Sequence, residues 1–105
     1  MFKRKSKPPV DHSKELFAKA NNKEWHEVKK LIKGGIDANS KSSFGGNLYG
    51  VARYFSNLRI IRWLLRHGFD PNQLIDNESY LQRELSGTNW RYAKVLIQHG
   101  ARLDI

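Results

Sequence analysis

Apolar residues recur along the chain in three short clusters with the spacing of one helical face. The clusters lie in the stretches EWHEVKKLI, NLRIIRWLL and NWRYAKVLI, which begin at Glu24, Asn57 and Asn89. In each stretch, apolar side chains at intervals of three and four residues would lie on one side of a helix and polar side chains on the other. The pattern predicts helices over 24–33, 58–67 and 90–99.

A similar segment ends each of these helices. The three segments are LIKGGIDAN from Leu31, LLRHGFDPN from Leu64 and LIQHGARLD from Leu96. A glycine stands at the same place in each, where the left-handed conformation that ends helices favours glycine. The segments are 33 and 32 residues apart. A period of this length predicts a stack of three similar units rather than one irregular core.

A second, shorter helix is expected before each of these helices. The predicted ranges are from a cap at Asp11 or Ser13 to about residue 20, then 48–55 and 79–85, and Asn57 and Asn89 are placed to cap the helices that follow. Polar loops over 40–46 and 73–78 would connect the units. We therefore expect an all-α solenoid of three helix–turn–helix units, about 11–39, 40–72 and 73–105, after a basic flexible segment 1–10.

The period, the paired helices and the LLRHGFDPN ending resemble ankyrin repeats, over about residues 16–104. The second helices carry the resemblance, whereas the T-P-L-H tetrad of the family's first helices becomes KELF, NLYG and SYLQ, from Lys14, Asn47 and Ser79. Glu84 stands where the family buries a small alanine, so we expect the third of these helices to be shifted in register. The resemblance implies a non-catalytic module that binds other macromolecules through its loop tips and the concave face of its first helices.

Charge is the most unusual property of the composition. Lys and Arg number 19 against 10 Asp and Glu, so the net charge is +9 and the isoelectric point is near 10.0. Such a surface attracts acidic proteins or nucleic acid. No apolar run is long enough for a membrane span and no secretory leader is recognisable, so we expect no membrane insertion and a location in the cytoplasm, or in the nucleus of a eukaryotic host.

No group of residues with the spacing of a catalytic or metal site was found. Cysteine is absent, which excludes disulfides and thiolate-bound zinc, and the four histidines lack metal-ligand spacing. His67 and His99 each precede a terminating glycine, where a histidine side chain can meet the last carbonyls of a helix. We expect no enzyme activity, no cofactor, no metal and no small-molecule substrate, and a monomer when the chain is free.

Cations share one face of the second helices. Placed in register, the outward positions hold His26, Arg59 and Arg91, then Lys29, Arg62 and Lys94, then Lys33, Arg66 and Gln98. Offsets of three and seven residues lie on one stripe of a helix. The stripe is either an ordinary solvated face or a binding ridge, and Lys3, Arg4 and Lys5 are either a phosphate-seeking arm, a nuclear import signal or a solvated tail.

Aromatic residues suggest a second surface. Trp25 and Trp90 begin second helices and are expected to pack between units, whereas Trp63 lies on the polar stripe, either exposed to a partner or covered by neighbouring side chains. The resemblance implies a binding face in which Tyr54, Phe55 and Phe44 form an apolar patch beside Arg53.

Two functions follow from these surfaces. The first is a module that binds an acidic protein partner and blocks or recruits it, as an inhibitor or immunity-type protein does, through Phe44, Arg53, Tyr54, Phe55, Arg59, Arg62, Trp63, Arg66, Leu74 and Ile75. The alternative is nucleic-acid binding through Lys3, Arg4, Lys5, Lys29, Lys33, Arg59, Arg62, Arg66, Arg91 and Lys94.

Overall fold

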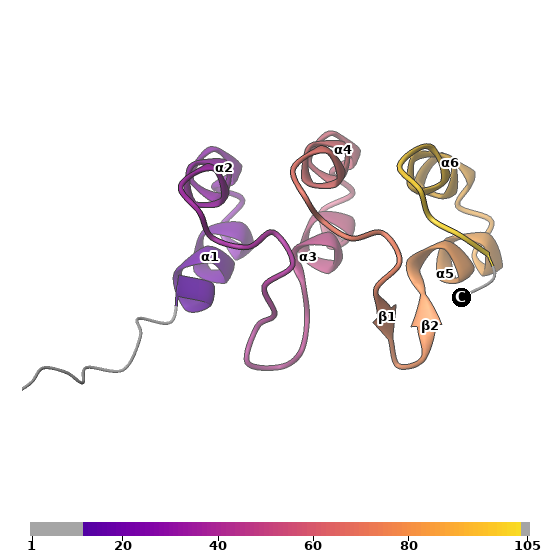
Figure 1. The fold of residues 1–105 in the computed structure, drawn as a ribbon, viewed down its shortest axis with the longest axis horizontal. Helices are drawn as coiled ribbons and strands as arrows, with labels where there is room; N and C mark the ends of the chain where they lie inside the picture. The colour runs from indigo at the N-terminus through magenta and orange to yellow at the C-terminus, as the bar shows by residue number, and fades with distance from the viewer. Residues whose placement is uncertain (1–11, 104–105) are drawn as a thin grey trace, which may run out of the picture.

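Six helices and one short hairpin make up the part of the chain that the computed structural model describes, residues 12–103. The first helix of each pair is α1 (His12–Asn21), α3 (Leu48–Tyr54) or α5 (Tyr80–Ser86), and the second is α2 (Trp25–Lys33), α4 (Leu58–Arg66) or α6 (Trp90–Gln98). The three pairs stand side by side in a row, with the first helices in one layer and the second helices in the other (Figure 1). The prediction of a mostly helical protein is confirmed.

We call the pairs with their following segments unit 1 (12–39), unit 2 (40–72) and unit 3 (73–103). Equivalent side chains from each unit fill the space between the two layers. Leu16, Tyr49 and Leu81 come from the first helices, and Val28, Ile61 and Ala93 come from the second helices; all six are at most 1% exposed. Each unit therefore contributes the same two positions to one continuous core.

Glycine ends each second helix as the pattern predicted. Gly35, Gly68 and Gly100 have φ of 119°, 100° and 97°, in the left-handed region where a side chain would be strained. The histidines before two of these glycines also behave as expected. His67 Nδ1 lies 2.8 Å from the Trp63 carbonyl oxygen, and His99 Nδ1 lies 2.9 Å from that of Val95.

Helix starts agree with the sequence in part. The Asn57 side chain accepts a hydrogen bond from Ile60 N at 3.1 Å, as predicted. Asn89 also stands at the N-cap position of α6, as predicted, but its side chain makes no capping bond and its amide lies near Gly87. The first helices α3 and α5 have caps of their own, because Asn47 and Ser79 accept from the backbone three residues on.

The segment expected to be a polar loop over 73–78 contains the hairpin. Strands β1 (Leu74–Ile75) and β2 (Glu78–Ser79) pair antiparallel, with Leu74 opposite Ser79 and Ile75 opposite Glu78. The two residues between them, Asp76 and Asn77, have φ of 53° and 65°. A two-residue turn with both φ values positive matches the twist of a hairpin, and Asp and Asn tolerate that conformation better than other residues with a side chain.

An asparagine at the end of one unit ties it to the next. Asn39 donates to the Gly68 carbonyl oxygen at 2.8 Å and accepts from Asp70 N at 2.7 Å. Asn72 repeats this arrangement one unit later, with the Gly100 carbonyl at 3.1 Å and Arg102 N at 2.9 Å. These bonds fix the spacing of neighbouring units independently of the apolar core.

The expected register shift in the third first-helix does not occur. Helix α5 begins and ends 32 residues after α3, the same offset that separates the second helices α4 and α6. Glu84 occupies the expected interior position and is only 5% exposed. It stays there because Arg53 of the neighbouring unit neutralises it, as described below.

Candidate functional site

A groove runs along the first-helix layer, between the helices and the segments that connect the units. It has a volume of about 530 Å³, and its lining includes Phe17, Phe44, Tyr54, Ile75, Tyr80 and Arg83. A second hollow of about 420 Å³ shares part of this lining and adds Lys14. We call the two together the first-helix groove. No Asp or Glu is among the described residues that line it, so the groove is apolar with a basic margin.

Two aromatic side chains project at the rim of this groove. Phe44, in the loop before α3, is 97% exposed, and Tyr54, at the end of α3, is 83% exposed. Tyr54 packs edge-on against Phe55, with ring centroids 5.1 Å apart, and Phe55 itself is half-buried beneath Lys23. The structure therefore brings three predicted partner-binding residues together in the groove, namely Phe44, Tyr54 and Ile75. Leu74 lies next to them on β1 and is half exposed.

Arg53 does not belong to this exposed set. Its Nε lies 2.9 Å from Glu84 Oε2, and its guanidinium lies 4.0 Å from the centre of the Tyr92 ring. Tyr49 donates its hydroxyl hydrogen to the same carboxylate oxygen of Glu84. The hydrogen bond to Glu84 raises the pKa of Arg53, and burial, followed by the bond to Glu84, raises the pKa of Tyr49. Arg53 joins units 2 and 3, which corrects the expectation that it would steer a partner.

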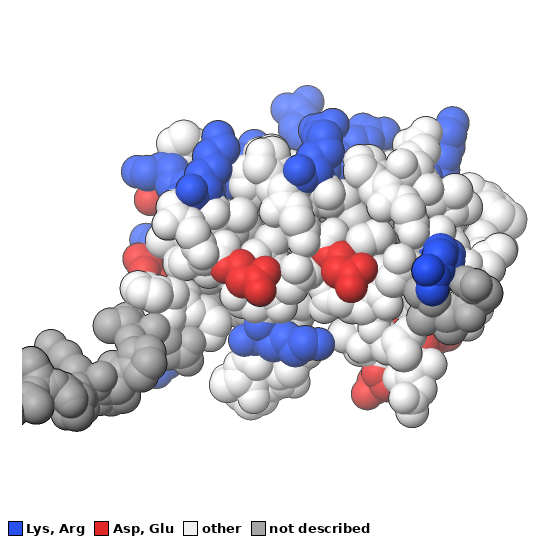
Figure 2. Space-filling model, in the orientation of Figure 1, with Lys and Arg blue, Asp and Glu red and all other residues white. Residues whose placement is uncertain are grey.

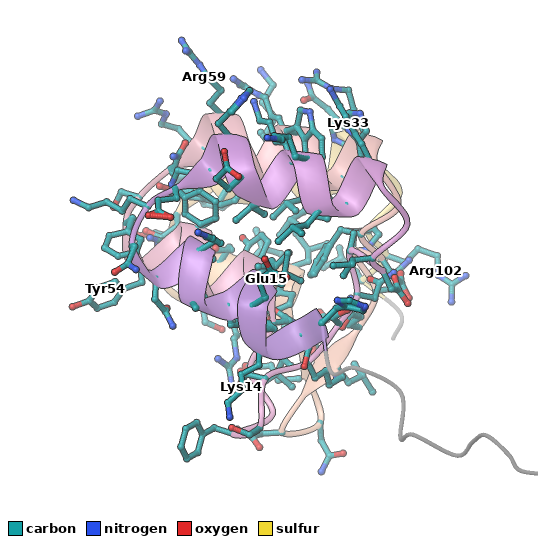
Figure 3. All side chains as sticks on the ribbon, turned by 90° about the vertical axis from the view of Figure 1, so that its left-hand side faces the viewer. Lys14, Glu15, Lys33, Tyr54, Arg59 and Arg102 are labelled. Carbon is teal, nitrogen blue, oxygen red and sulfur yellow. The ribbon has the colours of Figure 1, made fainter. Side chains whose placement is uncertain are left out.

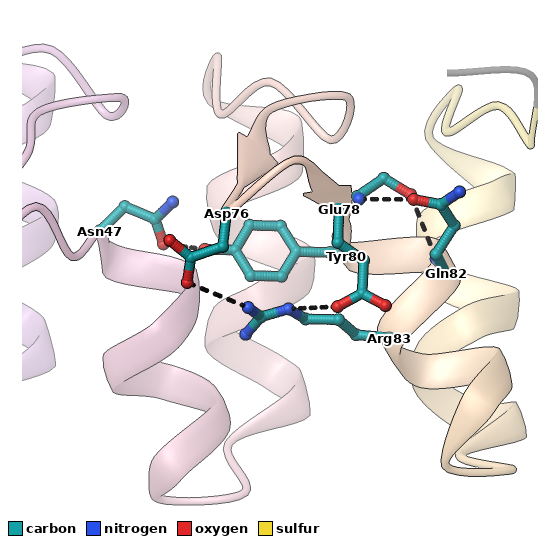
Figure 4. A network of polar contacts seen from close by, with 7 residues as sticks. Asn47, Asp76, Glu78, Tyr80, Gln82 and Arg83 are labelled. Atoms are coloured by element: carbon teal, nitrogen blue, oxygen red, sulfur yellow. Dashed lines mark hydrogen bonds and ion pairs between the residues drawn. The ribbon is translucent and has the colours of Figure 1, made fainter.

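A polar network holds the hairpin against α5, beside the groove (Figure 4). Arg83 bonds Glu78 at 3.0 Å and lies 3.7 Å from Asp76, so the tip and the second strand of the hairpin are tied to the helix. Tyr80 donates its hydroxyl hydrogen to Asn47 Oδ1 at 2.7 Å, which ties α5 to the cap of α3. Burial raises the pKa of Tyr80. The groove is thus built from side chains with fixed partners, whereas Phe44 and Tyr54 project from its rim.

The cations on the second helices lie on the opposite layer, and we call them the basic ridge. Six of them are exposed and, within residues 12–103, none is in an ion pair with an acidic group: Lys33, Arg59, Arg62, Arg66, Arg91 and Lys94. Helices α4 and α6 contain no acidic residue, and Glu27 on α2 pairs with Lys30 at 3.8 Å. Figure 2 shows Lys and Arg gathered along the edge formed by these helices.

The ridge and the groove cannot touch one flat partner surface. Viewed along the row of units, Arg59 and Lys33 project from the second-helix layer, and Lys14 projects from the opposite side (Figure 3). Tyr54 lies at the side of the molecule, near the turn that joins α3 to α4. Lys3, Arg4 and Lys5 lie outside the described residues.

The tryptophans differ from the sequence expectation in one case. Trp63 is half-buried, because its ring stacks on His67 with centroids 3.8 Å apart and Lys29 Nζ lies 5.6 Å from its centre. This settles the two alternatives for Trp63 in favour of cover by neighbouring side chains. Trp25 is half-buried as expected, but Trp90 is 65% exposed, so its expected packing between units was wrong. Unit 3 is the last in the described row, so no following unit lies over Trp90.

Sequence reasoning missed the cation that pairs with Glu84 and the hairpin beside the groove. Glu84 drew attention as an anomaly, but its cation lies 31 residues away, and only the superposition of units could have suggested Arg53. The hairpin turn was detectable, since Asp76-Asn77 is a two-residue pair of the type that favours positive φ.

Residues 12–103 contain no group of three His, Asp or Glu arranged to hold a metal ion. None of the helices in this range has the length and apolar character that crossing a membrane requires. Comparison with protein-family models, with curated proteins and with solved structures finds no match to this chain.

Proposed function

We propose that this protein is a non-catalytic, ankyrin-like interaction module that binds an acidic protein partner in the first-helix groove. The observation that carries the proposal is the pair of aromatic side chains at its rim, Phe44 at 97% and Tyr54 at 83% exposure. Exposing large apolar side chains to water is unfavourable in the free protein, and side chains of this kind beside a groove are typical anchors of protein interfaces.

The architecture supports this assignment. The second helices are offset by 33 and 32 residues, which fits the period and paired helices of a short ankyrin-like solenoid. The glycines after these helices and the asparagine ties recur from unit to unit, as in a stack of repeats. In such an array the first helices and loop tips form the binding face, and here that face is the groove. Such a module would exert its effect by occupying a partner's surface, as an inhibitor or recruiting factor does.

Charge defines the partner. Lys14 and Arg83 line the groove, and no acidic side chain of the described residues does so. Arg83 is itself paired with Glu78 and Asp76, so the attraction rests on Lys14 and on the net charge of +9 of the whole chain. The exposed Lys23 lies over the ring of Phe55, which packs against Tyr54, so a further cation stands beside the rim of the groove. An acidic partner would be attracted at long range by this field and held at short range by the aromatic anchors.

Site-specific photocrosslinking tests the proposal. A photoreactive amino acid at Phe44 or at Tyr54 should crosslink the same protein in nuclease-treated extract of the native source, and the same group at Arg66 on the ridge should not. With the purified partner, the double variant Phe44→Ser/Tyr54→Ser should weaken binding by at least about a hundredfold, the cost of about 3 kcal/mol expected of two anchors. Its thermal unfolding should be unchanged because both side chains are exposed. Equal crosslinking from Arg66, or binding unaffected by the double variant, would refute the groove as the site.

A second candidate function rests on the basic ridge. Six exposed cations that form no ion pair with an acidic group of the described residues suit contacts to the phosphates of nucleic acid, and they would act without reading sequence. If about six phosphates are contacted, affinity for unrelated DNA oligonucleotides should fall about a thousandfold between about 0.05 and 0.2 M salt. Arg59→Glu with Arg62→Glu should abolish this binding, and Lys14→Glu with Lys41→Glu, which change charge equally off the ridge, should weaken it much less. Equal losses in the two variants would show that net charge alone is responsible.

A further inference from the structure

Unit 3 presents an apolar face that nothing in residues 12–103 covers. Trp90 is 65% exposed, Ile97 54% and Leu103 63%. Trp90 and Ile97 are seven residues apart on α6, so they lie on one stripe of the helix and about 10 Å apart along its axis. Leu103 follows in the segment after that helix. We call these three side chains the end face.

The same positions in units 1 and 2 are interior contacts. Trp25 and Leu58 correspond to Trp90, Ile32 and Leu65 to Ile97, and Ala38 and Pro71 to Leu103; all six are buried or half-buried. In the first two units this side of the helix pair is covered by the unit that follows. The end face is therefore the side of unit 3 that corresponds to the stacking interfaces of units 1 and 2.

The opposite side of a unit shows the reverse trend. Lys30, Trp63 and Val95 are equivalent and face the preceding unit; Val95 is 2% exposed, Trp63 is half-buried, and the Lys30 side chain is 64% exposed. Glu15 and Asp37 line the same hollow as Lys30 at the start of the row. One end of the row is thus polar, as a solvated cap should be. At the other end Trp90 and Ile97 are exposed on α6, and Leu103 lies beside a hollow that polar side chains of the hairpin and α5 also line.

We propose that the end face is a self-association surface on which two copies of this chain pair tail to tail through their α6 helices. Head-to-tail stacking is disfavoured because it would bury Lys30 and Glu15 against Trp90 and Ile97 without new partners. An antiparallel crossing of two α6 helices about a twofold axis places Trp90 of each copy against the partner's Ile97. Both contacts form together, which is the self-complementarity that a twofold interface requires, and the dimer is closed because it uses both end faces.

Charge sets the conditions under which the dimer forms. The midpoint between Trp90 and Ile97 falls at Ala93 and Lys94, and Ala93 is buried. The exposed Lys94 of each copy would lie close to the twofold axis, with Arg91 nearby, and each copy carries a net charge of +9. Like charges oppose the pairing, so salt strengthens it by screening. Polyanion binding to the basic ridge has the opposite dependence on salt, which keeps the two interactions distinguishable.

Sedimentation equilibrium of the full chain tests the proposal at about 0.15 M and about 1 M salt, where the Debye length falls from about 8 Å to 3 Å. The expected result is a monomer–dimer equilibrium whose dissociation constant falls at least about tenfold at the higher salt. Trp90→Glu and Ile97→Glu should each raise that constant at least about tenfold, and Lys94→Gln should lower it at the lower salt. Phe44→Glu is the matched control, because it puts the same charge on an exposed aromatic position away from the end face.

Circular dichroism of each variant keeps the result interpretable, since all of these side chains are exposed and the fold should persist. A chain that stays monomeric at every concentration and both salts overturns the proposal. Species that grow beyond the dimer with concentration would indicate head-to-tail stacking instead. A dimer that Trp90→Glu leaves intact, or that salt weakens, would place the contact elsewhere. If the groove's protein partner loses affinity on Trp90→Glu, the end face belongs to that partner.

Discussion

Removing the guanidinium of Arg53 while keeping its apolar stem, as in Arg53→Met, tests whether a buried charge holds unit 3 to unit 2. In the native chain Arg53 Nε lies 2.9 Å from Glu84 Oε2, and the side chains of the pair are 31% and 6% exposed. The variant leaves Glu84 in the interior with Tyr49 as its remaining donor. A carboxylate there has lost both its counter-charge and a hydrogen bond.

The size of the effect follows from the burial of the two partners. Breaking a fully buried ion pair by removing one side costs about 3–5 kcal/mol, chiefly because the other charge is left unpaired. Arg53 is partly solvated, which lowers the cost, so we expect Arg53→Met to reduce the free energy of unfolding by about 2–3 kcal/mol. The double variant Arg53→Met/Glu84→Gln removes the orphaned charge and keeps an acceptor for Tyr49. It should recover at least half of the loss.

The chain contains a matched control for this experiment. Arg83 Nε and Glu78 Oε1 form the same type of bond at 3.0 Å, but both side chains are about two-fifths exposed, 42% and 43%. Exposed pairs contribute less than about 1 kcal/mol, so Arg83→Met should cost no more than that. Urea unfolding followed by tryptophan fluorescence at neutral pH measures all of these variants. With the single variant Glu84→Gln, it also gives the coupling energy between Arg53 and Glu84.

The comparison has a clear refuting result. If Arg53→Met and Arg83→Met lose the same free energy within about 0.5 kcal/mol, burial does not decide the strength of these pairs. A coupling energy between Arg53 and Glu84 below that size would likewise show that unit 3 is held by its apolar contacts alone.

Three other outcomes follow from single features of the structure. Burial raises the pKa of Tyr49, so the stability that depends on its protonated hydroxyl should be fully present below about pH 10 and should decline above it. The urea midpoint of Tyr49→Phe should therefore fall less steeply at alkaline pH than that of the native chain. Asn39→Ala removes the tie to unit 2 and should cost about 2 kcal/mol in the same unfolding assay; a loss within experimental error would show that the tie is replaced by water. Gly68→Ala places a side chain at φ of 100° and should lower the free energy of unfolding by about 1–3 kcal/mol. Gly50→Ala lies inside α3, where the new methyl group makes only an ordinary contact, and should raise that free energy by about 0.5–1 kcal/mol. If thermal melts show the same sign for both variants, the backbone argument is contradicted.

Features that depend on residues close together in the sequence could be predicted well. The apolar spacing in the second helices and the glycines after them determine where α2, α4 and α6 lie, because a helix and its end are encoded within a few turns. The histidine bonds at the ends of α4 and α6 are equally local. The short hairpin also depends on a local turn, but each of its strands has only two residues. That is too short for an alternation of apolar and polar residues to predict a strand.

Features that depend on distant residues could not be predicted. Glu84 looks incompatible with an interior position until Arg53, in another unit, is placed beside it. Trp90 repeats the position of Trp25, so a pattern that treats all units alike expects it to be interior, yet it is exposed because unit 3 has no following unit in the described row. The groove depends on how the units stack. The sequence was therefore enough to predict its exposed aromatic residues, but not to show that Arg53 pairs with Glu84 instead of lying beside them.

The Arg53–Glu84 pair has a consequence for the order of the units. In unit 1 the residue equivalent to Arg53 is Ala20, and in unit 2 the residue equivalent to Glu84 is Ala52. The junction between units 1 and 2 is therefore alanine to alanine, and the junction between units 2 and 3 is arginine to glutamate. If unit 2 were deleted, unit 3 would bring a buried carboxylate against Ala20 with no cation to meet it. Duplication of unit 2 would add a copy whose Arg53 faces Ala52. The asparagine ties are the same at both junctions and would accept any neighbour. The ion pair and the Tyr80–Asn47 bond belong to the junction of units 2 and 3, and they make these modules non-interchangeable.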